Sequence, residues 1–477
     1  MRSRVNSPSR LLPLVAMLVA IAPARADLHE SIDEVAARPE FASALVGVAV
    51  CDPATSELLY ERNAGKSMLP ASTMKTVSCA FALEMLGPKH TFRTEAKAAG
   101  VTGGVIDGPL YLVGSGYPYT YASTFADLAE AIAEAGVERV TGGIVADVSR
   151  FEGRRWRSGW TADDFLYYYG AWPDAINLNR QRVYFTVSPT QEDQPAEVTW
   201  DIPEADISVT SEAVTVAADD ETSLWIDRAL ESNEYTVTGT IAEGSEPQEI
   251  RRALVDPGLA AAAVLAARLR DQGVEVRGDV RYGVAPEDTT EVAGVDSAPL
   301  ADAIEVVLKY SDNLGAELMV WNTAVERGKG ARFADAMAYL SEWLEDRGMP
   351  MGGLRLSDGS GLSRYNYLTP RFLALHLAEM TRSLHFEVFK ECLPVAGVDG
   401  TLGSRFEGGV VEGRVSAKTG SLSRVSCLTG YAPRADGSLM TFAVMVNGYE
   451  CSISDVYRAQ EDIMTAVMTE DLREPGS

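Results

Sequence analysis

The stretch ALVGVAVCDPATSELLYERN (residues 44–63) predicts two β-strands joined by a turn at Asp52 and Pro53. A second stretch, ASTMKTVSCAFALEML (residues 71–86), predicts an amphipathic helix that ends before Gly87. The fold is therefore expected to open with two strands and a helix.

The last part of the chain is expected to complete the same sheet. Residues 298–328 predict long helices, and residues 416–433 and 437–450 predict strands that a turn connects. A final helix is expected from about Ser454. Because the first and last segments are expected to share one sheet, the middle of the chain is interpreted as an insertion.

The insertion contains two similar units. Residues 128–147 (LAEAIAEAGVERVTGGIVAD) and 265–283 (LAARLRDQGVEVRGDVRYG) each predict a helix, a Gly-Val-Glu turn and a strand. Asp256 and Pro257 are well placed as the N-cap and the first residue of the second helix. Between the two units, residues 183–250 alternate in the manner of short strands. A small β-rich domain is therefore expected inside an α/β domain.

The amino terminus and the net charge predict location and exclude some partners. Arg2, Arg4 and Arg10 precede an apolar run at residues 11–21, and the small residues that follow indicate a secretory signal peptide cleaved after Ala26. The run is shorter than the roughly 20 residues of a membrane span. We therefore expect an exported protein, in a periplasm or on the outer face of the cytoplasmic membrane. Its formal net charge of -26 disfavours nucleic acids and anionic membranes as partners.

Cysteine and histidine are too sparse to suggest metal chemistry. The five cysteines are scattered and odd in number, so most are expected to be buried apolar residues, although export permits one bridge. The four histidines have no metal-binding spacing and give little support to a Ser-His-Asp triad. No metal and no cofactor are expected. These residues are Cys51, Cys79, Cys392, Cys427, Cys451, His29, His90, His376 and His385.

Three short motifs outside the insertion carry candidate chemistry. Lysine is rare in this chain, yet Lys75 follows Ser72 by three residues at the predicted start of a helix. A Ser-Asp-Asn triplet (residues 311–313) lies in the predicted helical part, and a Lys-Thr-Gly triplet (residues 418–420) lies on a predicted strand. Each motif alone is weak evidence, but all three fall on segments assigned to one domain.

These residue types suit acyl transfer through a serine ester. Lys75 lies one helical turn from the serine hydroxyl and can act as its base if burial and a second cation, Lys418, lower its pKa. Ser311 can relay a proton to the leaving amine, and Asn313 can hold an amide carbonyl of the substrate. The backbone N–H groups of the nucleophilic serine and of Ser421 can form an oxyanion hole.

The motifs resemble those of a known family. PASTMK (residues 70–75), YSDN (310–313) and SAKTGS (416–421) resemble the active-site motifs of penicillin-binding proteins and serine β-lactamases. Two further segments, DGSGLSRYNYLTP (358–370) and LPVAGVDGTL (393–402), are similar to the low-molecular-mass class C D-alanyl-D-alanine carboxypeptidases/endopeptidases of peptidase family S13. That family carries extra domains between its first two motifs, which agrees with the insertion.

The resemblance implies an α/β (α+β) fold: a penicillin-binding transpeptidase-like domain with an antiparallel sheet flanked by helices. An inserted α/β domain, which carries the small β-rich domain, splits it. The expected divisions are the signal peptide (1–26), the catalytic domain (27–97 and 292–477), the inserted α/β domain (98–182 and 253–291) and the β-rich domain (183–252).

The resemblance also implies a serine DD-peptidase. Such an enzyme removes terminal D-alanine from peptidoglycan stem peptides, cleaves D-alanyl-diamino acid cross-links, or does both, and β-lactams acylate it. The implied catalytic residues are Ser72, Lys75, Ser311, Asn313 and Lys418, and the implied substrate-binding residues are Thr419, Gly420, Ser421, Asp164 and Arg364.

Three residues near the expected substrate-binding site can have either a binding role or a structural one. By resemblance, Asp164 binds the free amine of the stem-peptide diamino acid where the insertion approaches the cleft, but it can also be an ordinary surface acid. Arg364 can contact a substrate carboxylate or carbonyl, or form a structural ion pair. Tyr169 can line the same subsite as Asp164 or serve in packing.

Two other functions are alternatives to the peptidase. A class A β-lactamase would need a Glu-x-x-Leu-Asn motif between the second and third triplets, and none occurs between Asn313 and Lys418. A non-catalytic peptidoglycan-binding scaffold could use the insertion for docking. Loss of Ser72 or Lys75 would favour that interpretation, and both are present.

Overall fold

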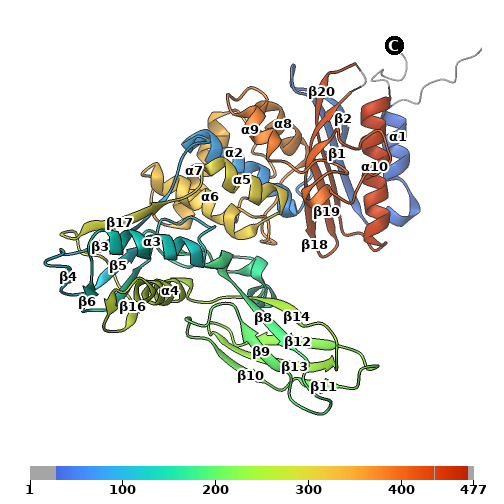
Figure 1. Ribbon diagram of the computed structural model, residues 1–477. Helices are drawn as coiled ribbons and strands as arrows, with labels where there is room; N and C mark the ends of the chain where they lie inside the picture. Colours follow the sequence, from blue (N-terminus) through green and yellow to red (C-terminus); the bar gives the residue numbers. More distant parts are fainter. Residues whose placement is uncertain (1–27, 435, 471–477) are drawn as a thin grey trace, which may run out of the picture.

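The computed structural model describes residues 28–434 and 436–470, so the predicted signal peptide lies outside the described residues. Within the described ranges, no helix has both the length and the apolar character that a membrane crossing requires. Figure 1 shows an elongated molecule in which a sheet and its helices form one end and the insertion forms the other.

The terminal segments of the chain meet in one five-stranded sheet. Its strand order is β18-β19-β20-β1-β2, and every neighbouring pair is antiparallel. Because β1 pairs with β20, the prediction that the first and last segments share a sheet is confirmed. The strands are β1 (Leu45–Asp52), β2 (Glu57–Arg62), β18 (Ser416–Leu422), β19 (Val425–Pro433) and β20 (Leu439–Asn447).

Helices cover both faces of this sheet, as Figure 1 shows. On one face, α1 (Leu28–Ala36) packs against α10 (Ile453–Thr469), and α10 contacts β19. On the other face, α8 (Pro370–Met380) contacts β1, β19 and β20. The two central strands β19 and β20 are therefore buried at almost every position, which explains their continuous apolar sequence.

A layer of helices surrounds α2 (Met74–Leu86) beside the sheet. Every residue from Met74 to Leu83 is buried, so the prediction of an amphipathic helix was wrong. The physical reason is that other helices of the layer pack around α2 and leave it no solvent face. Its neighbours include α5 (Leu300–Lys309), α6 (Asn313–Glu326), α7 (Phe333–Asp346) and α9 (Phe386–Glu391).

Two paired strands lie where the insertion is predicted to begin and end. β3 (Arg93–Ala98) and β17 (Thr290–Asp296) pair antiparallel at one side of the sheet β16-β7-β5-β3-β17. A smaller sheet has the order β15-β6-β4. The remaining strands of these sheets are β4 (Val105–Ile106), β5 (Leu110–Val113), β6 (Arg139–Val140), β7 (Ile144–Asp147), β15 (Glu275–Val276) and β16 (Val280–Tyr282).

The two similar units of the insertion lie side by side. Their helices, α3 (Ala122–Glu134) and α4 (Pro257–Asp271), pack together, and β6 and β7 pair in parallel with β15 and β16. Asp256 is the N-cap residue of α4 and Pro257 its first residue, as predicted, but the Asp256 carboxylate makes no cap hydrogen bond. It instead lies 3.3 Å from an Arg155 nitrogen, because the left-handed backbone of Asp256 (φ 45°) presents it to that cation.

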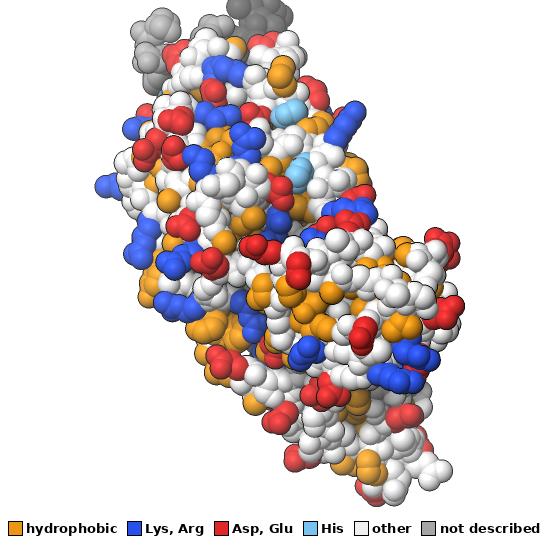
Figure 2. Space-filling model, turned by 90° about the vertical axis from the view of Figure 1, so that its left-hand side faces the viewer, with side chains coloured by type: hydrophobic (Ala, Val, Ile, Leu, Met, Phe, Trp, Pro, Cys, Tyr) orange, Lys and Arg blue, Asp and Glu red, His pale blue; other side chains and the backbone are white. Residues whose placement is uncertain are grey.

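Short strands occupy the region between the two units. They form the sheet β10-β13-β11, with β12 paired to β13, and the sheet β14-β8-β9. Arg228 is the only Lys or Arg in the sequence from 183 to 250, and Figure 2 shows acidic side chains on the lower end of the molecule, where these sheets lie. The strands are β8 (Arg182–Ser188), β9 (Glu197–Trp200), β10 (Ser208–Ser211), β11 (Val214–Val216), β12 (Ser223–Arg228), β13 (Glu234–Ala242) and β14 (Gln248–Ala253). The predicted domain boundaries themselves stay a prediction.

Short 3-10 helices connect several of these elements. They are η1 (Pro39–Phe41), η2 (Ala71–Thr73), η3 (Ala162–Leu166), η4 (Tyr168–Gly170), η5 (Asn179–Gln181) and η6 (Gly400–Leu402). All five cysteines are free thiols, and Cys451 alone among them is partly exposed. The expectation that most cysteines are buried apolar residues is confirmed.

Candidate active site

Ser72 lies on the 3-10 turn η2, directly before α2. The predicted helix start is therefore a tighter turn, and the preceding Ala71 has a left-handed backbone (φ 47°). Gly361 approaches this turn so closely that a Cβ atom there would lie 1.8 Å from the Ala71 carbonyl oxygen. A strained residue held by surrounding structure is typical of functional sites, and here it precedes the candidate nucleophile.

Lys75 is fully buried one turn after Ser72. Its Nζ atom lies 2.7 Å from Oγ of Ser72, 2.6 Å from Oδ1 of Asn313 and 2.8 Å from the carbonyl oxygen of Ser360. Three acceptors from three separate segments therefore fix the amine against the serine hydroxyl. The close Ser72–Lys75 contact is the geometry that a nucleophile and its base require.

The electrostatic surroundings of the two site lysines are dominated by burial. Burial lowers the pKa of Lys75 to about 8, against the opposing effect of nearby carboxylates. Lys418 is also fully buried, and burial together with the charge of Lys75 lowers its pKa well below the usual range. At pH 7, about a tenth of Lys75 is therefore neutral and able to accept a proton.

The Ser-Asp-Asn triplet breaks the predicted long helix into α5 and α6. Ser311 has a left-handed backbone (φ 58°) in the gap. Asp312 then caps α6 by accepting a hydrogen bond from Gly315 N at 2.8 Å. Asn313 is the first residue of α6. Because of the break, Ser311 and Asn313 both line the same cavity. In a continuous helix they would point to different sides, since residues i and i+2 do not share a face.

The insertion holds this triplet in place. Arg180 and Arg182 both form ion pairs with Asp312, and Nε of Arg180 lies 3.1 Å from its carboxylate. Although burial acts to raise it, the Arg180 charge keeps the pKa of Asp312 below its usual value. Asn313 also donates from Nδ2 to the carbonyl oxygen of Tyr169 at 2.8 Å. Sequence analysis gave no role to these two arginines, which no motif distinguishes from others in the chain.

The Lys-Thr-Gly triplet lies on β18, the edge strand beside the Ser72 turn. A Cβ atom on Gly420 would lie 2.7 Å from the Pro70 carbonyl oxygen and 3.1 Å from the Ser72 nitrogen. Only glycine allows this approach. Lys418 donates to the Thr419 carbonyl oxygen at 2.9 Å, and the Thr419 hydroxyl donates to Thr401 Oγ1 at 2.7 Å.

A cavity of about 410 Å³ brings most of the predicted residues together. Lys75 and Lys418 are buried and are not among its lining residues, and neither are Thr419 and Gly420. Those predicted side chains that do line it are Ser72, Ser311, Asn313, Ser421, Asp164, Arg364 and Tyr169. The cavity therefore presents several hydroxyls, an amide, a carboxylate and a guanidinium to one ligand volume.

Asp164 and Arg364 both line the cavity, and their side chains differ in how firmly hydrogen bonds hold them. The Asp164 carboxylate accepts hydrogen bonds from the Thr161 backbone nitrogen at 2.9 Å and from its hydroxyl at 2.8 Å, so it also closes the capping box of η3. Among the described residues, the Arg364 guanidinium makes one long contact, of 3.5 Å to the Ser423 carbonyl oxygen. Its guanidinium thus has donors left for a ligand.

Sequence analysis missed the buried acids behind the cavity. Asp358 is fully buried and accepts from the backbone nitrogens of Gly361 at 2.7 Å and Ser363 at 2.6 Å, and from Trp160 Nε1 at 2.8 Å. It therefore shapes the loop that meets the Ser72 turn. Asp358 begins the DGSGLSRYNYLTP segment, so the signal was present but pointed to a family and not to a role. Among the described residues, no group of three or more His, Cys, Asp or Glu is arranged to hold a metal ion.

Comparisons with known proteins cover almost all of the described chain. The family model described as D-Ala-D-Ala carboxypeptidase 3 (S13) matches residues 28–470. A D-alanyl-D-alanine carboxypeptidase of Actinomadura sp. (strain R39) is 35% identical over 92% of this chain and 86% of its own. The D-alanyl-D-alanine carboxypeptidase DacB of Haemophilus influenzae is 28% identical over 83% of each chain.

A solved structure has the same fold. The crystal structure of penicillin binding protein 4 (dacB) from Haemophilus influenzae matches with a TM-score of 0.81 and 24% identity, over 91% of this chain and 98% of that one. The α+β architecture with an antiparallel sheet flanked by helices, expected from the resemblance, is confirmed.

Proposed function

The chain belongs to the D-Ala-D-Ala carboxypeptidase 3 (S13) family, and from this premise we propose that Ser72 is the nucleophile with which it hydrolyses peptidoglycan stem peptides. It is a serine DD-peptidase. The observation that carries the residue assignment is the buried Lys75 amine, 2.7 Å from the Ser72 hydroxyl at the edge of a cavity. The proposed reaction removes the terminal D-alanine or cleaves a D-alanyl-diamino acid cross-link.

Acylation begins with a proton transfer from Ser72 to the neutral amine of Lys75. The Ser72 oxygen attacks the carbonyl carbon of the scissile D-alanyl peptide bond and forms a tetrahedral intermediate. The backbone N–H groups of Ser72 and Ser421 stabilise its oxyanion. Ser421 is well placed for this because it lines the same cavity and Gly420 brings its strand against the Ser72 turn.

Collapse of the intermediate breaks the carbon–nitrogen bond. The proton held by Lys75 passes through the Ser311 hydroxyl to the leaving amine, and a Ser72 ester remains. Lys75, neutral again, then takes a proton from water, whose oxygen attacks the ester carbonyl. When the carbon–oxygen bond breaks, the proton returns to Ser72 and the peptide leaves with a new carboxylate.

The other cavity residues bind and orient the peptide in this proposal. Asn313 donates to a substrate amide carbonyl, and its Oδ1 keeps the Lys75 amine in place. Arg364 provides positive charge for the substrate's terminal carboxylate, and Thr419 provides a further donor. Arg364 lines the cavity, whereas Lys418 is fully buried and is not among the lining residues.

Asp164 and Tyr169 form the proposed subsite for the diamino acid. The Asp164 carboxylate lines the cavity from η3, which belongs to the insertion and not to the segments that carry the catalytic motifs. A free ammonium group at the end of the diamino-acid side chain would be attracted to it. Tyr169 contributes a wall and, through its carbonyl oxygen, holds Asn313.

β-Lactams are the proposed covalent inhibitors. Their ring amide presents a carbonyl carbon to Ser72 in place of the scissile peptide, and ring opening leaves an ester on the same oxygen. We also propose that the protein is exported, because the amino-terminal sequence has the pattern of a signal peptide and the substrate polymer lies outside the cytoplasm.

Mass analysis of defined muropeptides tests the function. The mature protein is incubated with pentapeptide monomers and with cross-linked dimers, and we expect loss of one alanine from the former, conversion of the latter to monomers, or both. Ser72→Ala serves as the control, in which both reactions should stop. Unchanged muropeptides with the folded wild-type protein would contradict the proposal.

A further inference from the structure

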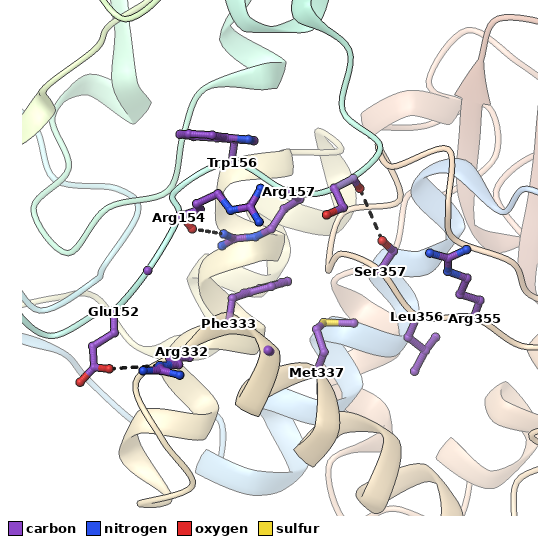
Figure 3. A pocket seen from close by; sticks show the side chains of 13 residues that line it. Glu152, Arg154, Trp156, Arg157, Arg332, Phe333, Met337, Arg355, Leu356 and Ser357 are labelled. Carbon is purple, nitrogen blue, oxygen red and sulfur yellow. Dashed lines mark hydrogen bonds and ion pairs between the residues drawn. The ribbon is translucent and has the colours of Figure 1, made fainter.

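A second cavity, of about 810 Å³, lies beside the segments that continue into the active site. One wall comes from residues 152–158, and the same segment reaches the active-site cavity at Asp164. Another wall comes from residues 355–357, which precede Gly361 of the active-site cavity. The third comes from the first residues of α7, as Figure 3 shows.

This cavity concentrates positive charge in a protein that is strongly acidic overall. The exposed side chains of Arg154, Arg332 and Arg355 line it from three different segments. Arg332 pairs loosely with Glu152 at 3.4 Å, with both side chains largely in solvent. In the described part of the chain, Arg154 and Arg355 contact aromatic rings and form no ion pair. Two guanidinium groups at its rim therefore have no anionic partner.

A buried donor in the wall supplies an independent observation. Arg157 lines the cavity but is only 4% exposed. Its Nε donates to Glu317 at 3.0 Å, and its Nη1 donates to the carbonyl oxygens of Arg154 and Arg155. Its Nη2 has no hydrogen-bond partner among the described residues. This nitrogen is itself buried, and the Arg157 guanidinium lies over the Phe333 ring, 3.5 Å from its centroid, so Arg157 holds the wall of the cavity and the exposed arginines are left to meet a ligand.

The floor of the cavity is apolar. Trp156, Phe333, Met337 and Leu356 line it between the arginines, and Figure 3 shows their side chains interleaved with the charged ones. Phe333 is also the first residue of α7, whose amino-terminal N–H groups favour negative charge. Carboxylates on an extended backbone with apolar parts match this surface better than a small inorganic ion, which would leave the floor uncovered.

We propose that this cavity is a second binding site, which holds a carboxylate-bearing stem peptide of peptidoglycan away from the scissile bond. The inference rests on the proposed function, because a cross-linked polymer presents further stem peptides next to the one being cleaved. Arg154 and Arg355 bind the carboxylates at the rim, and the apolar lining residues contact the rest of the peptide. The site would thus anchor the enzyme to its polymeric substrate and raise the local concentration of cleavable peptides.

Calorimetric titration of the full mature chain carrying Ser72→Ala tests the site. The probe is a muropeptide that ends in the diamino acid, since it has free carboxylates and no scissile D-alanyl bond. We expect binding that weakens with salt and that becomes at least about tenfold weaker in Arg154→Ala/Arg355→Ala, which removes two charge-assisted contacts. The matched control, Arg281→Ala/Arg414→Ala, removes two exposed arginines that do not line the cavity and should bind as before.

Further ligands decide between sources of negative charge. The same muropeptide with amidated carboxylates should bind at least about tenfold more weakly than the free acid. A glycerol-phosphate oligomer should bind less well than the free acid, and a preference for it would overturn the assignment in favour of a phosphodiester polymer. Absent binding, or equal binding by the rim and control variants, would also overturn it. Because this titration needs no catalysis, its result is independent of whether muropeptide turnover is observed.

Discussion

Arg157 of the insertion and Glu317 of α6 form a buried ion pair, with Arg157 Nε 3.0 Å from Glu317 Oε2 and the two side chains 3% and 0% exposed. The other carboxylate oxygen of Glu317 accepts from the backbone nitrogens of Gly359 and Ser360. The Ser360 carbonyl oxygen then accepts from Lys75 Nζ at 2.8 Å. The insertion is thereby connected to the proposed base through one continuous set of polar contacts.

Replacing the arginine of this ion pair should lower the free energy of unfolding. Arg157→Met leaves the Glu317 carboxylate buried without its cation, which costs about 3 to 5 kcal/mol of unfolding free energy. In Arg157→Met/Glu317→Gln the charge is gone, so we expect much of that loss to be recovered. Urea unfolding of these two variants and of Glu317→Gln alone measures the difference. If the double variant is as unstable as the sum of the single ones, the two residues do not act as a pair.

Ser72 should be the residue that a penicillin labels. A fluorescent penicillin is expected to attach to the wild-type protein, and peptide mapping should place the label on Ser72. Ser72→Ala should abolish labelling while the unfolding midpoint stays near the wild-type value, since only one hydroxyl is removed. Labelling that persists in this variant would assign the nucleophile elsewhere.

Replacing Lys75 tests the base without removing the cation. Lys75→Arg keeps a positive charge that cannot be lost near neutral pH, so acylation by penicillin should fall by at least about a hundredfold, the lower range for a general base. The variant should still bind substrate-like ligands if it is folded. Acylation within a few-fold of the wild-type rate would mean that another group takes the proton from Ser72.

The pH dependence of acylation should follow Lys75. Burial lowers the pKa of Lys75 to about 8, and only its neutral form can accept a proton. Below that pH the second-order rate of acylation should therefore rise by about tenfold per pH unit, and above it the rate should level off. Stopped-flow measurements between pH 5.5 and about 9.5, the latter set by this pKa, give the profile. A flat profile would contradict a lysine base.

Asp164 should affect peptide turnover more than penicillin acylation. Asp164→Asn removes the negative charge proposed to attract the free ammonium of the diamino acid, an interaction of about 1 to 4 kcal/mol depending on the water excluded. Penicillin lacks that group, so its acylation rate should stay near the wild-type value. The control is Asp163→Asn, because Asp163 is the preceding residue, is exposed and does not line the cavity.

Comparing peptide turnover with penicillin acylation shows which role Asp164 has. Equal losses in both would show that the hydrogen bonds from Thr161, which close the capping box of η3, matter for the fold of this loop. No loss in either reaction would remove Asp164 from the diamino-acid subsite. A loss confined to peptides with a free amine supports the proposal.

Local sequence patterns predicted those features that depend on residues close together in the sequence. The segment around the Asp52–Pro53 turn predicted β1 and β2, and the Ser72–Lys75 spacing predicted a contact of one helical turn. The similar units of the insertion were visible as repeated helix, turn and strand patterns. The three motifs could be found because reactive residue types stand at short fixed spacings.

Contacts between distant segments could not be predicted in the same way. Arg157 and Glu317 are ordinary charged residues in the sequence, and nothing local distinguishes Arg180 from other arginines. The full burial of α2 was missed because it depends on which helices surround it. The Asp256 carboxylate makes no N-cap hydrogen bond and instead lies near Arg155, which is far away in the sequence.

The sequence by itself determined the order of strands and helices, the presence of an insertion and the residue types of the site, because these depend on periodicity and on short spacings along the chain. Only the tertiary structure decided the environment of the Lys75 amine, since burial and the acceptors from Asn313 and Ser360 come from segments far apart in sequence. The pKa that makes a lysine a base is a property of that three-dimensional environment, in which water is excluded and charges are held at fixed distances.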